Sequence, residues 1–308
     1  MMRAKGFHYS KAWGQNFLVD KNVLEKVAQA AELSAADRVV EIGPGAGALT
    51  VLLAGQAGHV TAVEIDGRLI PMLKEVTEGL ENVDIVHDDF LKFKETMYIR
   101  DTNALPLTPS SHCEEPQPST VMRRSNPEES GKSESSLSRY KLVGNLPYYI
   151  TTPIIAGMFE TGADGLRPAP PELAAFMVQK EVAERLTSPP GKKAYGAISV
   201  LVQYYADVEI LSTVSREVFV PRPNVDSAVI RLKPKDLSGD EAETAARMFR
   251  LVRAGFDMRR KTLRNSLVRA GFPAEDLASA LAQANIDPGR RAETLSPRDF
   301  YALATYLT

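Results

Sequence analysis

The stretch RVVEIGPGAGALT, residues 38–50, decides the fold of this 308-residue chain. Its first five residues form a short apolar run, which predicts a buried β-strand. The run leads into Gly43, Gly45 and Gly47, which permit a sharp turn and the close approach of a ligand. Residues 48–55 then continue as a predicted helix. This order of strand, glycine-rich turn and helix is typical of an α/β fold with a ligand site at the turn.

Strands and helices alternate on both sides of this stretch. Before it, residues 20–33 place Val23, Val27 and Ala31 on one helical face, with Asp20 as the expected N-cap. After it, the pattern predicts a helix over residues 67–76 and strands over residues 59–66, 83–86, 141–145, 173–179 and 225–234. Alternation of this length favours a parallel, doubly wound sheet.

Two segments depart from this rhythm. Residues 99–139 hold five prolines and nine serines without an apolar period, which predicts a disordered or loosely ordered surface insertion. From residue 237 onward only helices are predicted, over residues 240–256, 273–285 and 296–307, the last with Ser296 as its cap. We therefore expect two domains, residues 1–236 and a small all-helical unit of residues 237–308.

Composition limits the class of protein. The single cysteine, Cys113, excludes an intrachain disulfide framework, and the four histidines show no metal-ligand spacing. Neither a signal peptide nor an apolar run long enough to span a bilayer is recognisable, so we expect a cytoplasmic protein that does not bind a membrane. We also expect no metal site. The net charge of −2 is uninformative, but residues 250–269 carry seven cations against one acid.

Acidic residues follow the next two predicted strands. Glu64 lies 21 residues after Gly43, where a carboxylate can accept hydrogen bonds from both ribose hydroxyls of a nucleotide-like cofactor. Asp89 follows the third strand and can reach an adenine edge, although spacing alone does not distinguish it from Asp88. This part of the sequence is compatible with either a nicotinamide cofactor or S-adenosylmethionine.

The segment GNLPYYI, residues 144–150, follows the predicted fourth strand at the carboxyl edge of the sheet. An exocyclic adenine amine is a poor nucleophile because its lone pair is delocalised into the ring. Groups that accept hydrogen bonds from its two N–H groups favour a pyramidal nitrogen, whose lone pair can attack a methyl group. The Asn145 side-chain oxygen and the Leu146 carbonyl can provide those acceptors, while Pro147 stiffens the turn. Tyr148 can stack on the base, so positioning and electrostatics are expected to carry most of the rate. The segment favours methyl transfer to adenine, with S-adenosylmethionine as the cofactor.

The sequence resembles the KsgA/RsmA family of ribosomal RNA small-subunit adenine dimethyltransferases. The resemblance extends over nearly the whole chain except residues 99–139. It runs through GQNFLVD (14–20), VVEIGPGAGALT (39–50), AVEID (62–66), DDF (88–90), LVGNLPYYIT (142–151), MVQKEVAERL (177–186), VFVPRPNVDSAVIRL (218–232) and RRAETLSPRDFYALA (290–304). The implied fold is a Rossmann-like class I S-adenosylmethionine-dependent methyltransferase sheet with a small C-terminal all-helical domain.

The resemblance also implies roles for residues around the cofactor. Asn16 and Leu18 would close over it, and Gly43 would lie beside its methionine end. Glu64 would bind the ribose, Asp89 would bind the adenine amine, and Asn145 would serve both cofactor and target. On the target side, the resemblance implies that Phe219 would stack on a flipped adenine opposite Tyr148.

The implied substrate is a pair of adjacent adenosines in the 3′-terminal hairpin loop of small-subunit rRNA. Each would receive two methyl groups during ribosome biogenesis, on a partly assembled ribosomal subunit. We expect an Arg-rich helix over residues 253–269, with Arg253, Arg260 and Arg264 along one stripe, to contact RNA phosphates. No feature of the sequence suggests an obligate protein partner, so a monomer is expected.

Three alternatives remain at this point. An Erm-like methyltransferase of large-subunit rRNA would share the fold and chemistry, but residues 145–151, 220–232 and 290–297 favour the KsgA family. A non-catalytic RNA-binding assembly factor would be expected to have lost the motifs at residues 41–47 or 145–148, and both are intact. A nicotinamide dehydrogenase is disfavoured by the glycine spacing.

Overall fold

The computed structural model describes residues 16–93, 140–159, 170–237 and 242–307. The predicted insertion, residues 99–139, and Cys113 lie outside these ranges. The strands are β1 (Phe17–Leu18), β2 (Arg38–Ile42), β3 (His59–Glu64), β4 (Val83–His87), β5 (Tyr140–Asn145), β6 (Leu173–Gln179), β7 (Ala206–Val214), β8 (Phe219–Val220) and β9 (Ser227–Pro234). The helices are α1 (Lys21–Ala30), α2 (Ala48–Ala54), α3 (Ile70–Val76), α5 (Thr151–Gly157), α6 (Lys180–Thr187), α7 (Ala197–Tyr205), α8 (Ala242–Asp257), α9 (Leu263–Arg269), α10 (Ala274–Gln283) and α11 (Pro297–Thr305).

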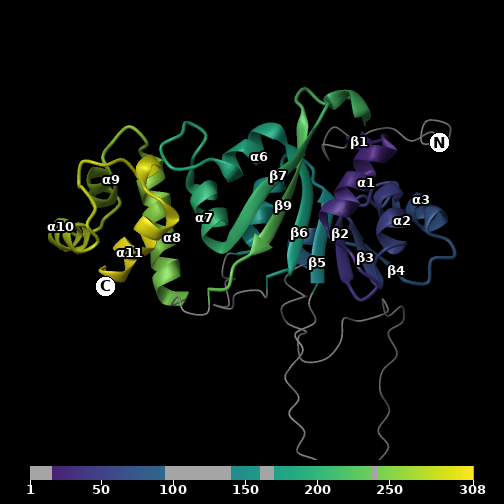
Figure 1. The fold of residues 1–308 in the computed structure, drawn as a ribbon, viewed down its shortest axis with the longest axis horizontal. Helices are drawn as coiled ribbons and strands as arrows, with labels where there is room; N and C mark the ends of the chain where they lie inside the picture. Colours follow the sequence, from purple (N-terminus) through teal and green to yellow (C-terminus); the bar gives the residue numbers. More distant parts are fainter. Residues whose placement is uncertain (1–15, 94–139, 160–169, 238–241, 308) are drawn as a thin grey trace, which may run out of the picture.

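A central sheet organises the molecule, with strand order β4-β3-β2-β5-β6-β9-β7 (Figure 1). Each pairing from β4 through β6 is parallel, as predicted. The prediction of an all-parallel sheet is wrong at β9, which pairs antiparallel with both β6 and β7. The connection from β7 to β9 is short and contains no crossover helix, so the chain returns in the opposite direction.

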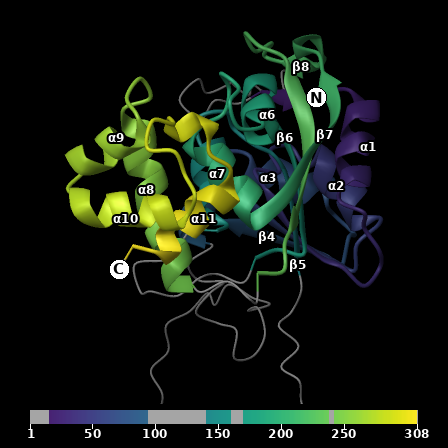
Figure 2. The ribbon, with the colours of Figure 1, turned by 60° about the vertical axis from the view of Figure 1, so that its left-hand side comes forward.

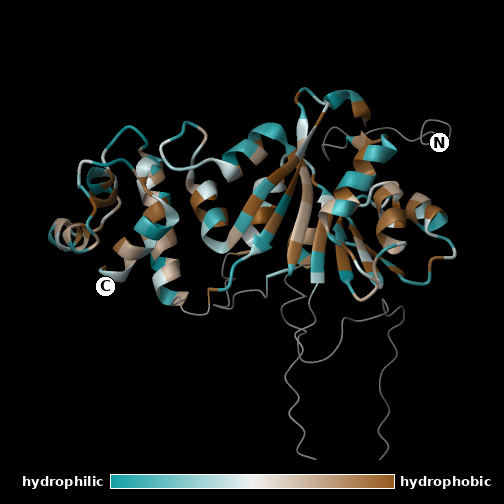
Figure 3. Ribbon diagram, viewed as in Figure 1, coloured by the Kyte–Doolittle hydropathy of each residue, from teal (hydrophilic) through white to brown (hydrophobic). Residues whose placement is uncertain are grey.

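Residues of the strands alternate between two apolar layers. Val40, Leu142 and Phe176 pack in one cluster with residues of α5, α6 and α7. Val39 and Val143 pack in the other cluster with residues of α1 and α2. Helices therefore cover both faces of the sheet, and Figure 3 shows the resulting apolar strands between helices of mixed polarity. This architecture confirms the predicted fold class.

Helix α1 begins and ends at identifiable contacts. As predicted, Asp20 caps it, because Asp20 Oδ1 accepts hydrogen bonds from the backbone N–H groups of Asn22 (2.9 Å) and Val23 (3.2 Å). The predicted apolar face is buried: Val27 and Ala31 are fully inaccessible to solvent. Just beyond the helix, Glu32 takes a left-handed conformation with φ of 49°.

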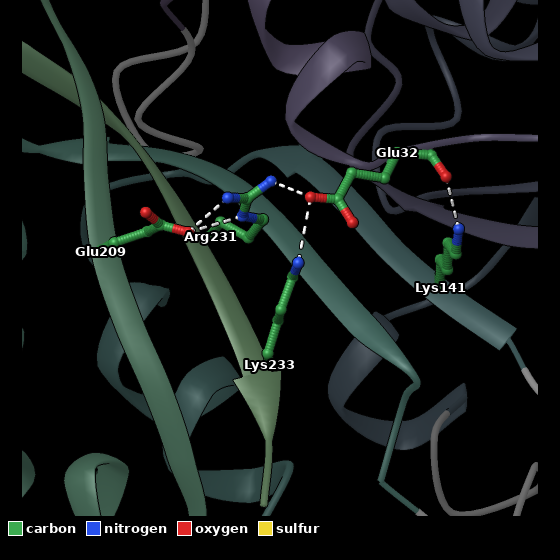
Figure 4. Close-up of polar contacts among 5 residues, drawn as sticks. All are labelled: Glu32, Lys141, Glu209, Arg231 and Lys233. Atoms are coloured by element: carbon green, nitrogen blue, oxygen red, sulfur yellow. Dashed lines mark hydrogen bonds and ion pairs between the residues drawn. The ribbon is translucent and has the colours of Figure 1, made fainter.

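A polar network holds Glu32 against the sheet (Figure 4). Lys141 Nζ, at the start of β5, donates to the Glu32 carbonyl oxygen (2.6 Å) and pairs with Asp37 (3.0 Å). The Glu32 carboxylate accepts from Arg231 and from Lys233 Nζ (3.0 Å), both on β9. The network thus joins the end of α1 to two strands that are distant in sequence.

The C-terminal helices gather at one end of the molecule (Figure 2). Ser296 caps α11 as predicted, since its Oγ accepts from the Asp299 N–H (3.1 Å) while the Asp299 carboxylate accepts from the Ser296 N–H (2.9 Å). Buried residues of α8 and α11 share one apolar cluster with residues of α5, α6 and α7. The division into domains 1–236 and 237–308 stays a prediction.

The expected continuous helix over residues 253–269 is wrong. Helix α8 ends at Asp257 and α9 begins only at Leu263. A turn closes in between, with the Lys261 N–H donating to the Met258 carbonyl (2.9 Å). Thr262 then caps α9, because its hydroxyl accepts from the Asn265 N–H (3.3 Å). The threonine side chain competes with helix continuation here, a local contact that the charge pattern concealed.

Candidate functional site

The glycine turn between β2 and α2 needs glycine at all three positions. Gly43, Gly45 and Gly47 have φ angles of 67°, 59° and 85°, a region that other residues rarely adopt. A Cβ at Gly47 would also lie 2.8 Å from Leu73 Cδ1, so this glycine lets α2 approach α3. A Cβ at Gly43 would meet no atom within 4 Å and would border an open cavity. Gly43 therefore leaves space for a ligand, whereas Gly47 serves packing.

Glu64 is held at the end of β3 by backbone donors. Its Oε2 accepts from the Gly45 N–H (2.9 Å) and its Oε1 accepts from the Asp66 N–H (2.8 Å). The side chain is 5% exposed, and burial raises the pKa of its carboxyl group. Each carboxylate oxygen has a second lone pair, so the anchored group can still accept hydrogen bonds from a ligand.

Asp88 and Asp89 follow β4 and border the same cavity. Asp88 Oδ1 accepts from the Asp89 N–H (2.7 Å), and Asp89 Oδ1 accepts from the Leu91 N–H (2.9 Å). Both side chains are half-buried. The structure brings both acids to the predicted position, and the preference for Asp89 as the adenine ligand stays a prediction.

The segment after β5, residues 145–150, also borders the cavity. Asn145 Nδ2 donates to the Asn16 carbonyl (3.1 Å), which makes Oδ1 the acceptor end of the amide. The Leu146 N–H donates to the Met177 carbonyl (3.0 Å), and the Pro147 carbonyl accepts from the Ile150 N–H (3.1 Å). These bonds fix the turn that carries the predicted acceptors.

Tyr148 is oriented toward β9 by a hydroxyl contact. Its Oη and Ser227 Oγ lie 2.9 Å apart. Ser227 is fully buried, and burial raises the pKa of the Tyr148 phenol. Tyr148 is itself half-buried and borders the cavity, so part of its ring remains accessible to a ligand.

A two-stranded sheet of β1 and β8 contributes further residues to the cavity lining. Strands β1 and β8 pair antiparallel, with Leu18 opposite Phe219 and Phe17 opposite Val220. Leu18 and Val220 border the cavity, but Phe219 is 2% exposed and packs in the core with α1 and α2 residues. Phe219 is not among the described residues that line the cavity, so its predicted stacking role stays a prediction.

The cavity has a volume of about 770 Å³, in the range of small-molecule sites. It lies at the carboxyl edge of the parallel strands, where open α/β sheets bind ligands. The structure brings together ten of the predicted cofactor and catalytic residues as its lining: Asn16, Leu18, Gly43, Gly45, Glu64, Asp89, Asn145, Leu146, Pro147 and Tyr148.

Two further lining residues were missed in the sequence. Glu41 is 1% exposed, and burial, with the nearby charge of Glu64, raises its pKa to about 8. Its Oε2 has no hydrogen-bond partner among the described residues. An acid inside the apolar run RVVEI was the signal available for it. Tyr149 is the other, 52% exposed at the cavity edge.

No helix in the described ranges is long and apolar enough to cross a membrane. Within the same ranges, no three His, Cys, Asp or Glu side chains are grouped as metal ligands would be.

The predicted RNA-contacting residues lie on three different segments. Arg253 is on α8, Arg260 in the turn and Arg264 on α9, so they do not form a stripe on one helix. Next to them, Arg259 donates to the carbonyl oxygens of Lys193 and Tyr195, each at 3.1 Å. This contact fixes the exposed loop that carries Lys192 and Lys193 beside the turn. Sequence reasoning missed these two lysines, because the contact joins residues 66 positions apart.

Comparisons with known proteins agree with this geometry. A sequence model described as ribosomal RNA adenine dimethylase matches residues 6–308. The chain is 39% identical over 303 residues to "Ribosomal RNA small subunit methyltransferase A" of Clostridioides difficile (strain 630), covering 98% of this chain and 91% of that one. It is 41% identical over 307 residues to the protein of the same name from Moorella thermoacetica (strain ATCC 39073 / JCM 9320), covering 100% and 95%.

Solved structures give the same result. The crystal structure of the 23S rRNA methyltransferase ErmE superposes with a TM-score of 0.64 at 27% identity, covering 95% of this chain and 99% of that one. A dimethyladenosine transferase from Plasmodium falciparum superposes with a TM-score of 0.67 at 25% identity, covering 93% and 95%. The resemblance inferred from the motifs is thereby confirmed, and the chain belongs to the ribosomal RNA adenine dimethylase family.

Proposed function

We propose that this protein transfers methyl groups from S-adenosylmethionine to N6 of two adjacent adenosines in the 3′-terminal hairpin loop of small-subunit rRNA, giving dimethyladenosines during ribosome biogenesis. The observation that carries the proposal is that residues 145–148 and the glycine turn border one cavity. The cavity would thus hold the adenine amine of the target beside a nucleoside cofactor. The names of the full-length relatives favour the small subunit over the large one.

The residues present fit the cofactor. The open space beside Gly43 would accommodate its methionine end, and the anchored Glu64 carboxylate would present acceptors to its ribose hydroxyls. Asp89 would accept from its adenine amine, while Asn16 and Leu18 would cover it. When bound, S-adenosylmethionine supplies an electrophilic methyl group.

The protein groups act on the target by position. Asn145 Oδ1 and the Leu146 carbonyl would accept hydrogen bonds from the two N–H groups of the adenine amine, which would direct its lone pair toward the methyl group. The amine becomes acidic after transfer, so a strong general base is not required. Tyr148 would stack on the flipped base. Phe219 could stack on the second face only if its ring left the apolar core in which it packs.

RNA would be held by the basic surface at the helical end. Arg260, with Lys192 and Lys193 on the adjacent loop, is exposed, and none of the three forms an ion pair with another described residue. Glu293, the acid next to them, is already paired with Arg259 (3.1 Å). The surface therefore keeps the positive charge of Arg260, Lys192 and Lys193 unpaired for phosphates. Arg253 on α8 and Arg264 on α9, the other predicted contacts, lie on the two helices that flank the turn.

The proposed substrate is a partly assembled small subunit, bound by a monomer in the cytoplasm. The test uses small and large subunits from a strain lacking the modification, incubated separately with purified protein and labelled S-adenosylmethionine. We expect label in small-subunit RNA with the wild type and none with Asn145→Ala. Label confined to large-subunit RNA would favour Erm-like activity, and RNA binding without label would favour an assembly factor; either result contradicts the proposal.

A further inference from the structure

Two consecutive tyrosines follow the proline of the turn after β5, and their surroundings differ. Tyr148 is half-buried and its hydroxyl is tied to Ser227 on β9. Tyr149 is 52% exposed, and no hydrogen bond of its hydroxyl is found among the described residues. Both border the cavity. The proposed function uses Tyr148 and assigns nothing to Tyr149.

The two rings have different neighbours around the cavity. Strand β5 stands in the middle of the sheet, with β6 and β9 on one side and β2, β3 and β4 on the other. Tyr148 contacts the β9 side. Tyr149 borders the cavity together with Glu64 and Asp89, at the ends of β3 and β4. Burial first, and then the negative charges of Asp89 and Glu64, raise the pKa of the Tyr149 phenol.

These two acids are the groups proposed to bind the nucleoside part of the cofactor. A flat ligand held at its polar edges by Glu64 and Asp89 leaves its faces to be covered by other groups. Phe90, which is 7% exposed, lines the cavity directly after Asp89. Tyr149 is a large ring on the rim that is half in water, so a planar ligand would bury more of it. An aromatic face over a nucleobase stabilises binding without demanding a particular hydrogen bond.

We infer that Tyr149 covers the adenosyl group of the cofactor, whereas Tyr148 serves the target base. This inference rests on the proposed function, because it assumes that the Glu64–Asp89 end of the cavity takes the cofactor. It divides the two neighbouring rings between the two substrates, and it makes Tyr149 a positioning residue for the cofactor.

The test measures cofactor binding by calorimetry for the wild type, Tyr149→Ala, Tyr149→Phe and Tyr148→Ala. S-adenosylmethionine and S-adenosylhomocysteine are both titrated, because they share the adenosyl group and differ in charge at sulfur. We expect Tyr149→Ala to raise the Kd of both ligands by about tenfold. Tyr149→Phe, which keeps the ring, and Tyr148→Ala should stay within about twofold of the wild type. Thermal unfolding of each variant verifies that the fold is intact. If Tyr149→Ala is unstable, Tyr149→Leu takes its place, because it also removes the aromatic ring but keeps a large apolar side chain.

Steady-state kinetics provide a second readout. Tyr149→Ala should raise KM for S-adenosylmethionine and leave KM for the RNA substrate within about twofold. Unchanged cofactor binding by Tyr149→Ala, or an effect on RNA alone, would overturn the inference. So would a loss limited to S-adenosylmethionine, because it would place the ring at the sulfonium group instead. If the wild type binds neither ligand, the proposed function itself fails.

Discussion

Asn145 Nδ2 donates a hydrogen bond to the carbonyl oxygen of Asn16 across 3.1 Å, joining residues 129 positions apart in the chain. The bond connects the strand-end turn with the segment that precedes α1, and both residues line the cavity. Because the amide nitrogen is engaged, its oxygen is the end that can accept a hydrogen bond from the target amine. The same Asn145 side chain therefore contacts the segment before α1 through its nitrogen and presents its oxygen to the proposed target amine.

Replacing this amide should separate catalysis from folding. We expect Asn145→Ala to lower kcat by about a hundredfold or more, because the acceptor acts on the amine as it becomes a cation. The matched control is Asn82→Ala, since Asn82 Nδ2 also donates to backbone carbonyls, of Ala54 and Ala57, outside the cavity. Asn82→Ala should lower the melting temperature and keep kcat. Equal kcat losses in both variants would contradict the assignment.

Two glycines provide a test of the cofactor turn. Gly43 and Gly79 both have positive φ angles (67° and 83°) and open space at the Cβ position, but only Gly43 borders the cavity. Alanine at either position should cost about 1–2 kcal/mol of stability through the backbone. Only Gly43→Ala should also weaken the binding of S-adenosylmethionine, measured by calorimetry. Similar cofactor affinities of the two variants would show that Gly43 serves only the turn.

The buried acid Glu41 predicts a dependence of stability on pH. Its pKa is about 8 in the folded protein against 4.5 ordinarily, so the folded state retains a proton that the unfolded state releases. Stability from this group is fully present below about pH 4.5 and is lost as the pH rises through 8. Across that range the wild type should lose on the order of 4 kcal/mol relative to Glu41→Gln, which does not titrate.

Urea unfolding of the cofactor-free protein at pH 5, 7 and 8.5 measures this difference. Glu78→Gln, at an exposed position, is the control and should follow the wild type at each pH. Parallel pH profiles of the wild type and Glu41→Gln would mean that Glu41 is ionised in the folded protein.

The basic surface predicts a salt-dependent loss of RNA affinity. The double variant Arg260→Ala/Lys192→Ala should reduce the slope of log affinity against log salt by about 1.5, because each phosphate contact contributes about 0.7–0.9. Cofactor affinity should not change. The control removes two exposed cations, Lys26 on α1 and Lys74 on α3, at the opposite end of the molecule (Figure 1). An equal loss in the control would indicate that net charge alone governs binding.

Local patterns predicted most of the structure, and distant contacts supplied the rest. The strand over residues 38–42, the Asp20 cap and the Ser296 cap depend on neighbours in sequence, and all three were predicted. The break after Asp257 was missed because a charge stripe cannot reveal a competing threonine cap. Helices α6 and α7 and strand β7 were not predicted, although residues 177–186, which include most of α6, belong to a motif that carries the family resemblance.

In the candidate site too, residues marked by local patterns were predicted, and placements that depend on long-range contacts were not. Residues 43–47, 64, 89 and 145–148 were predicted because parallel strands bring their carboxyl ends to one edge. The role of Phe219 at the target stays a prediction, because its strand pairs with β1 and its ring packs in the core. That pairing is two residues long and joins segments about 200 residues apart, so no local pattern marks it. Lys192 and Lys193 join the basic surface through a comparable long-range contact with Arg259.

The protein is proposed to convert adenosines of small-subunit rRNA to dimethyladenosines in this cavity. The most direct measurement is digestion of the RNA after reaction with undermethylated small subunits, followed by mass spectrometry of the modified nucleosides and their positions. We predict N6,N6-dimethyladenosine at two adjacent positions in the 3′-terminal hairpin loop, and at neither position with Asn145→Ala. Any other methylated nucleoside, or dimethyladenosine at other sites only, would contradict the account.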